Sequence, residues 1–267
     1  MAVYTTIDDP SLYFDTLTYT GNMSTDRDIT GLSFSPNFVW VKNRSTTNYH
    51  NIKDSVRGAS VVLFSNNNDA EISDSDRVTA FLSNGFTVSN SADTNGSGNS
   101  MVAWCWKESA TAGFDIVSYT GNATDRTISH SLSAVPKVII IKNRSTTNWW
   151  HTYHHALGNN YEVYLNETNA KGSTDAYQST DPTSSVFSLD DSVDGTNGDG
   201  NSLIAYLFAE KQGFSKFGSY TGNGDADGVF LYLGFKPAFF LCKNYQDNGD
   251  NWILHDNKRN TSNVTDE

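Results

Sequence analysis

Three histidines lie close together in one segment of the chain, His151, His154 and His155. Imidazole is the commonest metal ligand among protein side chains. On a β-strand, alternate residues share a face, so His151 and His155 would point the same way and His154 the opposite way. The related segments near His50 and His255 keep one histidine each. We therefore expect polar residues on a half-exposed strand here, and no metal site.

A glycine-rich loop further on carries oxygen ligands of the kind that Ca²⁺ binds. The weak calcium candidates in it are Asp191, Asp194, Asn197 and Asp199. Their spacing departs from the EF-hand loop, and no glutamate closes the set. The related loop at 93–99 keeps a single acidic residue. A polar turn explains both loops, so we expect no cofactor, with calcium as the open alternative.

The sequence has no motif of a known catalytic centre. It contains neither a Gly-x-Ser-x-Gly elbow nor a phosphate-binding loop. Paired carboxylates for glycoside cleavage come from distant strands and cannot be recognised by spacing. Asp54 and Asp256 recur at related places, but His154 or His155 stands there in the second segment. We expect a protein that is not an enzyme.

Aromatic residues are the richer signal, because Phe, Tyr and Trp make up 13 % of the chain. Rings on a β-surface can hold the apolar faces of sugars while Asn, Asp and Arg supply hydrogen bonds. Neighbouring Trp149 and Trp150 must point to opposite sides of a strand, and arginine reads polar groups through a rigid fork. The candidate glycan- or partner-binding residues are Arg44, Asn48, Arg144, Asn148, Trp149 and Trp150.

Other aromatic residues have the pattern of a core. Trp104 and Trp106 alternate along one apolar run, and Tyr206 and Phe208 alternate along another. Alternation places each pair on one face of its strand. We expect these four side chains to face the interiors of β-sandwich modules.

The elements that position these residues are repeated. The string Lys-Asn-Arg-Ser-Thr-Thr-Asn occurs at 42–48 and again at 142–148, and Tyr-Thr-Gly-Asn occurs at 19–22, 119–122 and 220–223. A proline and a short apolar run ending in Lys-Asn follow in each copy. Such self-similarity at a fixed period indicates tandem modules.

Short segments rich in β-branched and aromatic residues alternate with clusters of Asn, Ser, Asp and Gly, which predicts many short strands. The expected fold is all-β, with tandem jelly-roll-like β-sandwich modules of about 100 residues. We place an N-terminal segment at 1–13, modules at 14–113 and 114–213, and a partial third copy at 214–267. The first segment is either an arm that docks on another protein or a leading strand of the first module.

Composition excludes several classes of function. The net charge of −12 argues against nucleic acid, because binding to phosphates needs a basic surface. No apolar run reaches the length of a membrane-spanning helix, so we expect no membrane insertion. The opening residues lack the basic and apolar regions of a secretory signal. Cys105 and Cys242 occupy non-equivalent places of the repeat, and we expect two buried thiols.

The repeated motifs resemble a family. Tyr-Thr-Gly-Asn, the proline with its run to Lys-Asn-Arg-Ser, Gly-Phe-Thr-Val, and Asn-Ser-x-Val-Ala-Trp-x-Trp-Lys are similar to a domain of unknown function. That domain occurs in tandem in virion proteins of tailed phages, especially marine ones, often labelled tail fibre or tail protein. The resemblance covers nearly the whole chain. The family has no assigned catalytic residues, so no site is transferred.

The resemblance implies a virion structural protein, a tail fibre or appendage that attaches to host-surface glycans. A capsid or tail decoration protein without a receptor is one alternative, and a glycan-cleaving depolymerase is another. Because a half module would leave an apolar face and an unpaired edge in water, we expect a homo-oligomer. A trimer, or association with other virion proteins, would cover both.

Overall fold

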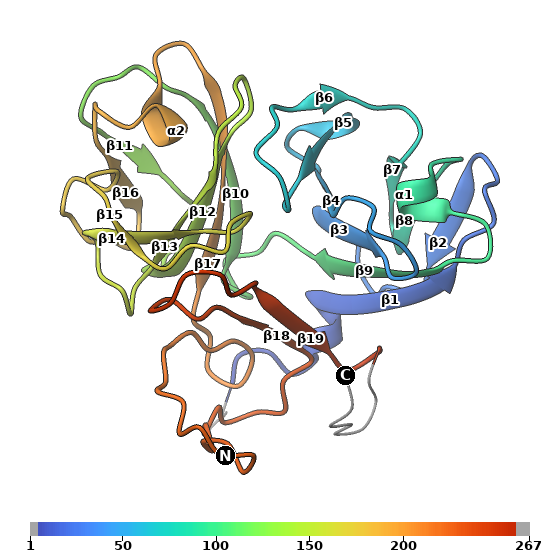
Figure 1. Ribbon diagram of the computed structural model, residues 1–267. Coiled ribbons are helices and arrows are strands. Elements are labelled where there is room, and N and C mark those ends of the chain that lie inside the picture. Colours follow the sequence, from blue (N-terminus) through green and yellow to red (C-terminus); the bar gives the residue numbers. More distant parts are fainter. Residues whose placement is uncertain (1–4, 260–267) are drawn as a thin grey trace.

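The computed structural model describes residues 5–259 (Figure 1). Nearly all of its elements are strands in antiparallel sheets, which confirms the predicted all-β class. Helix within these residues is limited to the 3-10 turn η1 (Pro10–Leu12) and the short α1 (Ala92–Asn95) and α2 (Asp194–Asn197). No helix in the described part of the chain is long and apolar enough to cross a membrane.

The first large sheet lies on the right of Figure 1 and has the strand order β1-β9-β3-β4-β5-β6. Its strands are β1 (Phe14–Thr20), β3 (Phe38–Asn43), β4 (Asn51–Asp54), β5 (Gly58–Phe64), β6 (Ile72–Ser73) and β9 (Ser100–Trp106). A small sheet of order β2-β8-β7 accompanies it, with strands β2 (Arg27–Thr30), β7 (Val78–Leu82) and β8 (Gly85–Val88). Val41 and Cys105 of the large sheet pack with Ile29 and Phe86 of the small one, as in a β-sandwich.

The second large sheet lies on the left and has the order β10-β17-β12-β13-β14-β15. Its strands are β10 (Phe114–Thr120), β12 (Pro136–Asn143), β13 (Trp150–His154), β14 (Tyr161–Tyr164), β15 (Gly172–Ser173) and β17 (Ser202–Ala209). Strands β11 (Arg126–Ser129) and β16 (Val186–Leu189) form the accompanying pair. Ile141 and Ala205 pack with Ile128 and Phe187 in the core between these two sheets.

The two large sheets correspond strand by strand. In the first, Phe14 pairs with Trp106 across β1 and β9. In the second, Phe114 pairs with Phe208 across β10 and β17. Repeated segments of the sequence therefore form strands at the same places in the two sheet orders. The module limits at 14–113 and 114–213 stay a prediction.

The last part of the described chain contains one hairpin, β18 (Phe239–Cys242) with β19 (Ile253–Asp256). Phe239 pairs with Asp256 as Phe38 pairs with Asp54 in the first sheet. Residues 216–238 form no strand. In Figure 1 the hairpin lies below the junction of the two large sheets.

A third core joins the two sheets and the hairpin, and it corrects one expectation. Trp104 and Tyr206 belong to this shared core, and Trp106 and Phe208 pack against it. The sandwich core of the first unit takes the intervening Ala103 and Cys105 instead. The prediction that the alternating aromatic residues face the sandwich interior is therefore wrong, although these residues do share a face. The aromatic face of β9 and β17 is the one turned toward the neighbouring unit.

The N-terminal segment is described from residue 5 onward. Residues 5–13 contain the η1 turn and no strand, and the docking of this segment on another protein stays a prediction. Asp9 begins the turn by accepting a hydrogen bond from the backbone N–H of Ser11. Ile7 is buried, so this segment packs against the body of the protein.

Candidate functional site

A pocket of about 450 Å³ opens beside β13 and β14 in the second sheet. Its walls come from the loop before β13, from alternate residues of β13 and β14, from the end of β15, and from the start of α2. Alternate residues share a face of each strand, so His151, Glu162 and Tyr164 project to the same side. Asn148, Trp149, Asp175 and Asp194 complete the polar and aromatic lining.

The floor of the pocket is a chain of hydrogen bonds. His151 Nδ1 lies 2.9 Å from Glu162 Oε2, and the two side chains are buried. The hydroxyl of Tyr164 donates to the other carboxylate oxygen of Glu162 at 3.0 Å. His151 Nε2 lies 3.2 Å from Asn148 Oδ1. Burial, together with the negative charge of Glu162, raises the pKa of Tyr164 well above its usual value, so the phenol stays a donor.

An exposed aromatic ring forms the rim. Trp149 is 43 % exposed, and its ring centroid lies 4.7 Å from that of Tyr164 at an angle of 38°. Trp150 points the other way, as the sequence predicts for adjacent strand residues, and is fully buried. Its indole N–H donates to the carbonyl of Phe64 in the first sheet at 2.9 Å. Trp149 is thus available to a ligand, whereas Trp150 joins the two units.

The matching place in the first unit is filled. Phe64 takes the register position of Tyr164, because it pairs with Asn51 as Tyr164 pairs with His151. The Arg77 guanidinium lies 5.3 Å from the centre of the Phe64 ring. It is held there by ion pairs to Asp74 at 2.6 Å and to Asp93 at 2.9 Å. The second unit has no such arginine in the lining of its pocket, which leaves its aromatic surface open.

The repeated Lys-Asn pair has a structural role. Lys142 Nζ donates to the carbonyl of Asn148 at 2.6 Å, and Asn143 Nδ2 donates to a carbonyl of α2 at 3.1 Å. Lys42 and Asn43 make the corresponding bonds at 2.7 and 2.8 Å. These bonds satisfy backbone carbonyls and fix the loops that carry Asn48 and Asn148.

The two predicted arginines have different surroundings. Arg144 makes a two-pronged contact with Glu71 of the first unit, at 2.7 and 3.0 Å. Arg44 is exposed, and its guanidinium has no hydrogen-bond partner among residues 5–259. Asn48 donates to Asp93 at 2.7 Å, away from the pocket. The structure therefore brings Asn148 and Trp149 together and separates the other predicted residues from them.

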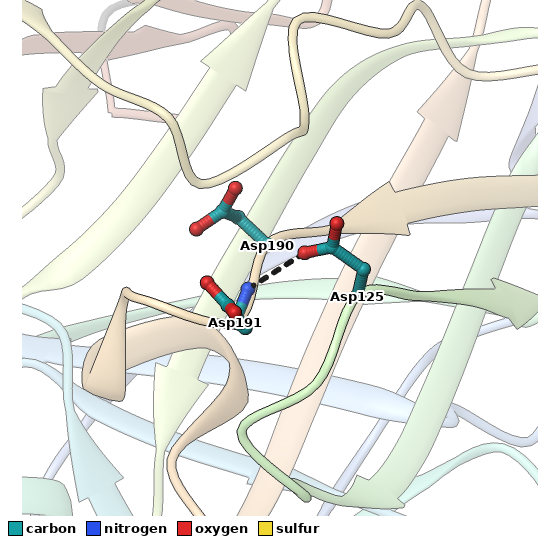
Figure 2. Close-up of side chains that lie close together, drawn as sticks. All are labelled: Asp125, Asp190 and Asp191. Atoms are coloured by element: carbon teal, nitrogen blue, oxygen red, sulfur yellow. Dashed lines mark hydrogen bonds between the residues drawn. The ribbon is translucent and has the colours of Figure 1, made fainter.

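The calcium candidates are not brought together. Asn197 is buried and donates to backbone carbonyls of Thr124 and Asp190, so its amide fastens loops. Within the described residues, the acidic group near enough to share an ion is Asp125, Asp190 and Asp191 (Figure 2). Asp125 accepts from the backbone N–H of Asp191 at 3.1 Å, and Asp190 accepts from Ser192. These hydrogen bonds account for the cluster as a capped turn.

The predicted histidine pair is also separated. His151 contacts Glu162, whereas His155 Nε2 lies 3.2 Å from the carbonyl of Phe217. His154 Nδ1 accepts from the backbone N–H of Ala156 at 3.1 Å. No group of three metal-ligating side chains within the described part of the chain includes a histidine.

The sequence did not predict two side chains of the candidate site, Glu162 and Tyr164. Both stand in the short segment Tyr-Glu-Val-Tyr, where an acid alternates with apolar residues. A carboxylate at a core-facing position of a strand needs a partner, because burying an unpaired charge is costly. Applied to Glu162, this rule could have identified His151 as its partner from the sequence.

The sheet topology and the pocket together define the protein as an all-β protein of antiparallel sheets with an open pocket lined by aromatic and acidic side chains. Residues 9–267 match the family described as "Domain of unknown function (DUF7483)", so the chain belongs to this family. Comparison with curated proteins gives no match, and comparison with solved structures gives none either.

Proposed function

We propose that the protein is a structural component of a tailed-phage virion, a tail fibre or appendage, that attaches to glycans on the host surface. The virion part of the proposal is supported by the resemblance of the repeated motifs to tail proteins. The glycan part is supported by the pocket of the second unit. The protein acts by binding and carries out no reaction in this proposal.

The exposed ring of Trp149 is the observation that carries glycan binding. A sugar can lay its apolar C–H face on such a ring while its hydroxyl groups bond to polar atoms around the rim. Asn148, Asp175 and Asp194 supply amide and carboxylate groups in the lining. Acidic groups attract hydroxyl donors and repel anions, so the favoured ligand is a neutral, hydroxyl-rich saccharide.

The first experiment measures binding of neutral oligosaccharides by titration calorimetry, with Trp149→Ala as the test variant. Loss of the ring should weaken binding by about two- to tenfold, since an aromatic contact contributes on the order of 0.5–1.5 kcal/mol. Tyr49→Ala is the matched control, because Tyr49 is exposed next to Phe64 where Arg77 fills the site. Equal losses in the two variants, or no binding to any neutral glycan, would contradict the proposal.

The alternative of a decoration or assembly protein is favoured by a different observation. Val229, Phe230, Leu231 and Tyr232 are exposed in one short segment, and such apolar patches mark contacts with other proteins. Saturable binding of the purified chain to virion particles without glycan binding would favour this alternative. Release of oligosaccharide from host envelope would instead favour a depolymerase.

A further inference from the structure

The hairpin strand β18 has one unpaired edge. In the large sheets, β3 lies between β4 and β9, and β12 lies between β13 and β17. β18 is the corresponding strand of the third copy and pairs with β19 on one side. Among residues 5–259 no strand pairs with its other edge. The position that β9 and β17 occupy in the large sheets is therefore open beside β18.

The segment that would flank this position from the far side is also unpaired. Residues 214–221 read Phe-Ser-Lys-Phe-Gly-Ser-Tyr-Thr, similar to β1 and β10. β1 and β10 are held as strands by β9 and β17. In the third copy the segment forms no strand beyond the single bridge at Ser215. Phe230, which follows it, is 86 % exposed, whereas Ile29 at the corresponding place of the first unit is 6 % exposed.

The open position is continuous with a large apolar cavity. This cavity, of about 1400 Å³, lies between the two large sheets and the third segment. Rings from all three copies line it, among them Trp106, Phe208 and Phe239. Its size and lining suit the aromatic side chains of one more strand.

A side-chain hydrogen bond from one unit to the next occurs twice, and the third position where it could form has no such bond among the described residues. Tyr206 of β17 donates to Asp54 of the first unit at 2.7 Å. Trp104 of β9 donates to Asp256 of the hairpin at 3.0 Å. The position of Asp54 in the second unit belongs to His154, which lines the cavity. Because His154 Nδ1 accepts from a backbone N–H, the hydrogen lies on Nε2, and this donor has no partner among the described residues.

We propose that this gap is an acceptor site for a β-strand of a partner polypeptide. The strand would pair with β18 on one edge and with residues 214–221 on the other. It would carry apolar residues at alternate positions over about the seven residues of β9, including an aromatic residue toward the cavity. A hydrogen-bond acceptor, such as a tyrosine hydroxyl, would face His154.

The occupant is assigned to a partner because the open edge of β18 and the exposed apolar residues 229–232 form the kind of surface that an added strand covers. Strand addition to an open edge gains main-chain hydrogen bonds, while pockets for alternate side chains select the sequence. The proposal holds whether or not the protein belongs to a virion.

The test uses the full chain and a synthetic peptide with the sequence of β17, Leu-Ile-Ala-Tyr-Leu-Phe, flanked by lysines for solubility. We expect saturable binding with one peptide per chain, and slower amide hydrogen exchange at both flanks, 214–221 and 239–242. A scrambled peptide of the same composition is the control. Failure to bind at peptide concentrations up to about 1 mM, or protection confined to other segments, would overturn the proposal.

A double-mutant cycle tests the register. The peptide with phenylalanine in place of tyrosine should bind several-fold more weakly to the natural chain. The two peptides should bind alike to His154→Ala, because the donor is then absent. Independent effects of the two changes would refute the predicted contact. If the chain associates with itself and β18 is already protected without peptide, a second copy covers the gap and the partner assignment is wrong.

Discussion

Replacing Trp104 by alanine tests the shared core at one of its largest fully buried side chains. Trp104 is 1 % exposed and packs among aromatic rings of its own sheet and of the hairpin, with Trp40 at 5.5 Å and Phe239 at 6.2 Å between ring centroids. Its indole N–H bonds to Asp256, and the guanidinium of Arg259 lies 5.1 Å from its ring. One side chain therefore links β9 to the hairpin through packing, a hydrogen bond and a cation–π contact.

The magnitude follows from these three contacts. Truncating a buried tryptophan to alanine costs about 3–5 kcal/mol, with the upper end expected where neighbouring rings cannot collapse into the space. Asp256 keeps hydrogen bonds from the side chain and backbone of Arg259, so its carboxylate is not left unpaired. Trp104→Phe retains most of the packing and should cost about 1.5–3 kcal/mol, the worth of a hydrogen bond to a charged group.

Urea unfolding gives these free energies, and hydrogen exchange shows where the effect is felt. If Trp104 lies in the shared core, its loss should speed exchange in β18 and β19 more than in β2 and β8, which form the opposite layer of its own unit. An unchanged unfolding midpoint would refute the burial. Faster exchange confined to β2 and β8 would show that the ring faces the sandwich interior after all.

Three further perturbations have defined outcomes. Tyr206→Phe removes the donor to buried Asp54 and should lower the free energy of unfolding by about 1.5–3 kcal/mol in urea; no change would refute the contact. Gly195→Ala places a methyl group 2.1 Å from His151 Nε2, so it should displace the imidazole and abolish glycan binding in calorimetry, and unaltered affinity would contradict the pocket. Burial, aided by the charge of His155, lowers the pKa of His154 to about 4. The unfolded state therefore takes up a proton on this imidazole at a higher pH than the folded state does. Stability should fall as the pH drops from about 6.5 to 4, and His154→Gln should flatten that slope in unfolding curves.

The strands could be predicted because their residues carry the signal locally. β-branched and aromatic runs between Asn and Gly turns mark each strand. Alternation alone could not predict which face of a strand points into the core of its own sandwich. In β9, Trp104 alternates with Ala103 and Cys105, and both sets are buried. A run that is apolar at every position indicates a strand covered on both sides, and this reading would have pointed to a neighbouring unit.

The candidate site was only partly predictable. Adjacent tryptophans must diverge on a strand, so exposure of one of Trp149 and Trp150 followed from the sequence. The pairing of His151 with Glu162 depends on the register between β13 and β14 across a turn, which no local pattern specifies. The contrast between Arg44 and Arg144 depends on which unit has a neighbour at that surface. Identical heptapeptides thus have different contacts.

The contacts between units are directional. The carbonyl of Arg144 accepts from the backbone N–H of Glu71 at 2.9 Å. Between the second unit and the hairpin, the carbonyl of Tyr245 accepts from the backbone N–H of Lys171, also at 2.9 Å. The hairpin therefore contacts the second unit through the same surface that the second unit uses to contact the first.

A hydrogen bond from an indole N–H to a carbonyl of the preceding unit also occurs twice. Trp150 donates to the carbonyl of Phe64, and Trp252 donates to the carbonyl of Tyr164, each at 2.9 Å. Contacts that repeat head to tail close into a ring or continue indefinitely. The bond from Trp104 to Asp256 joins the first unit back to the hairpin, so these contacts form a ring. Arg144 uses its surface to contact Glu71 of the first unit, whereas its counterpart Arg44 is exposed.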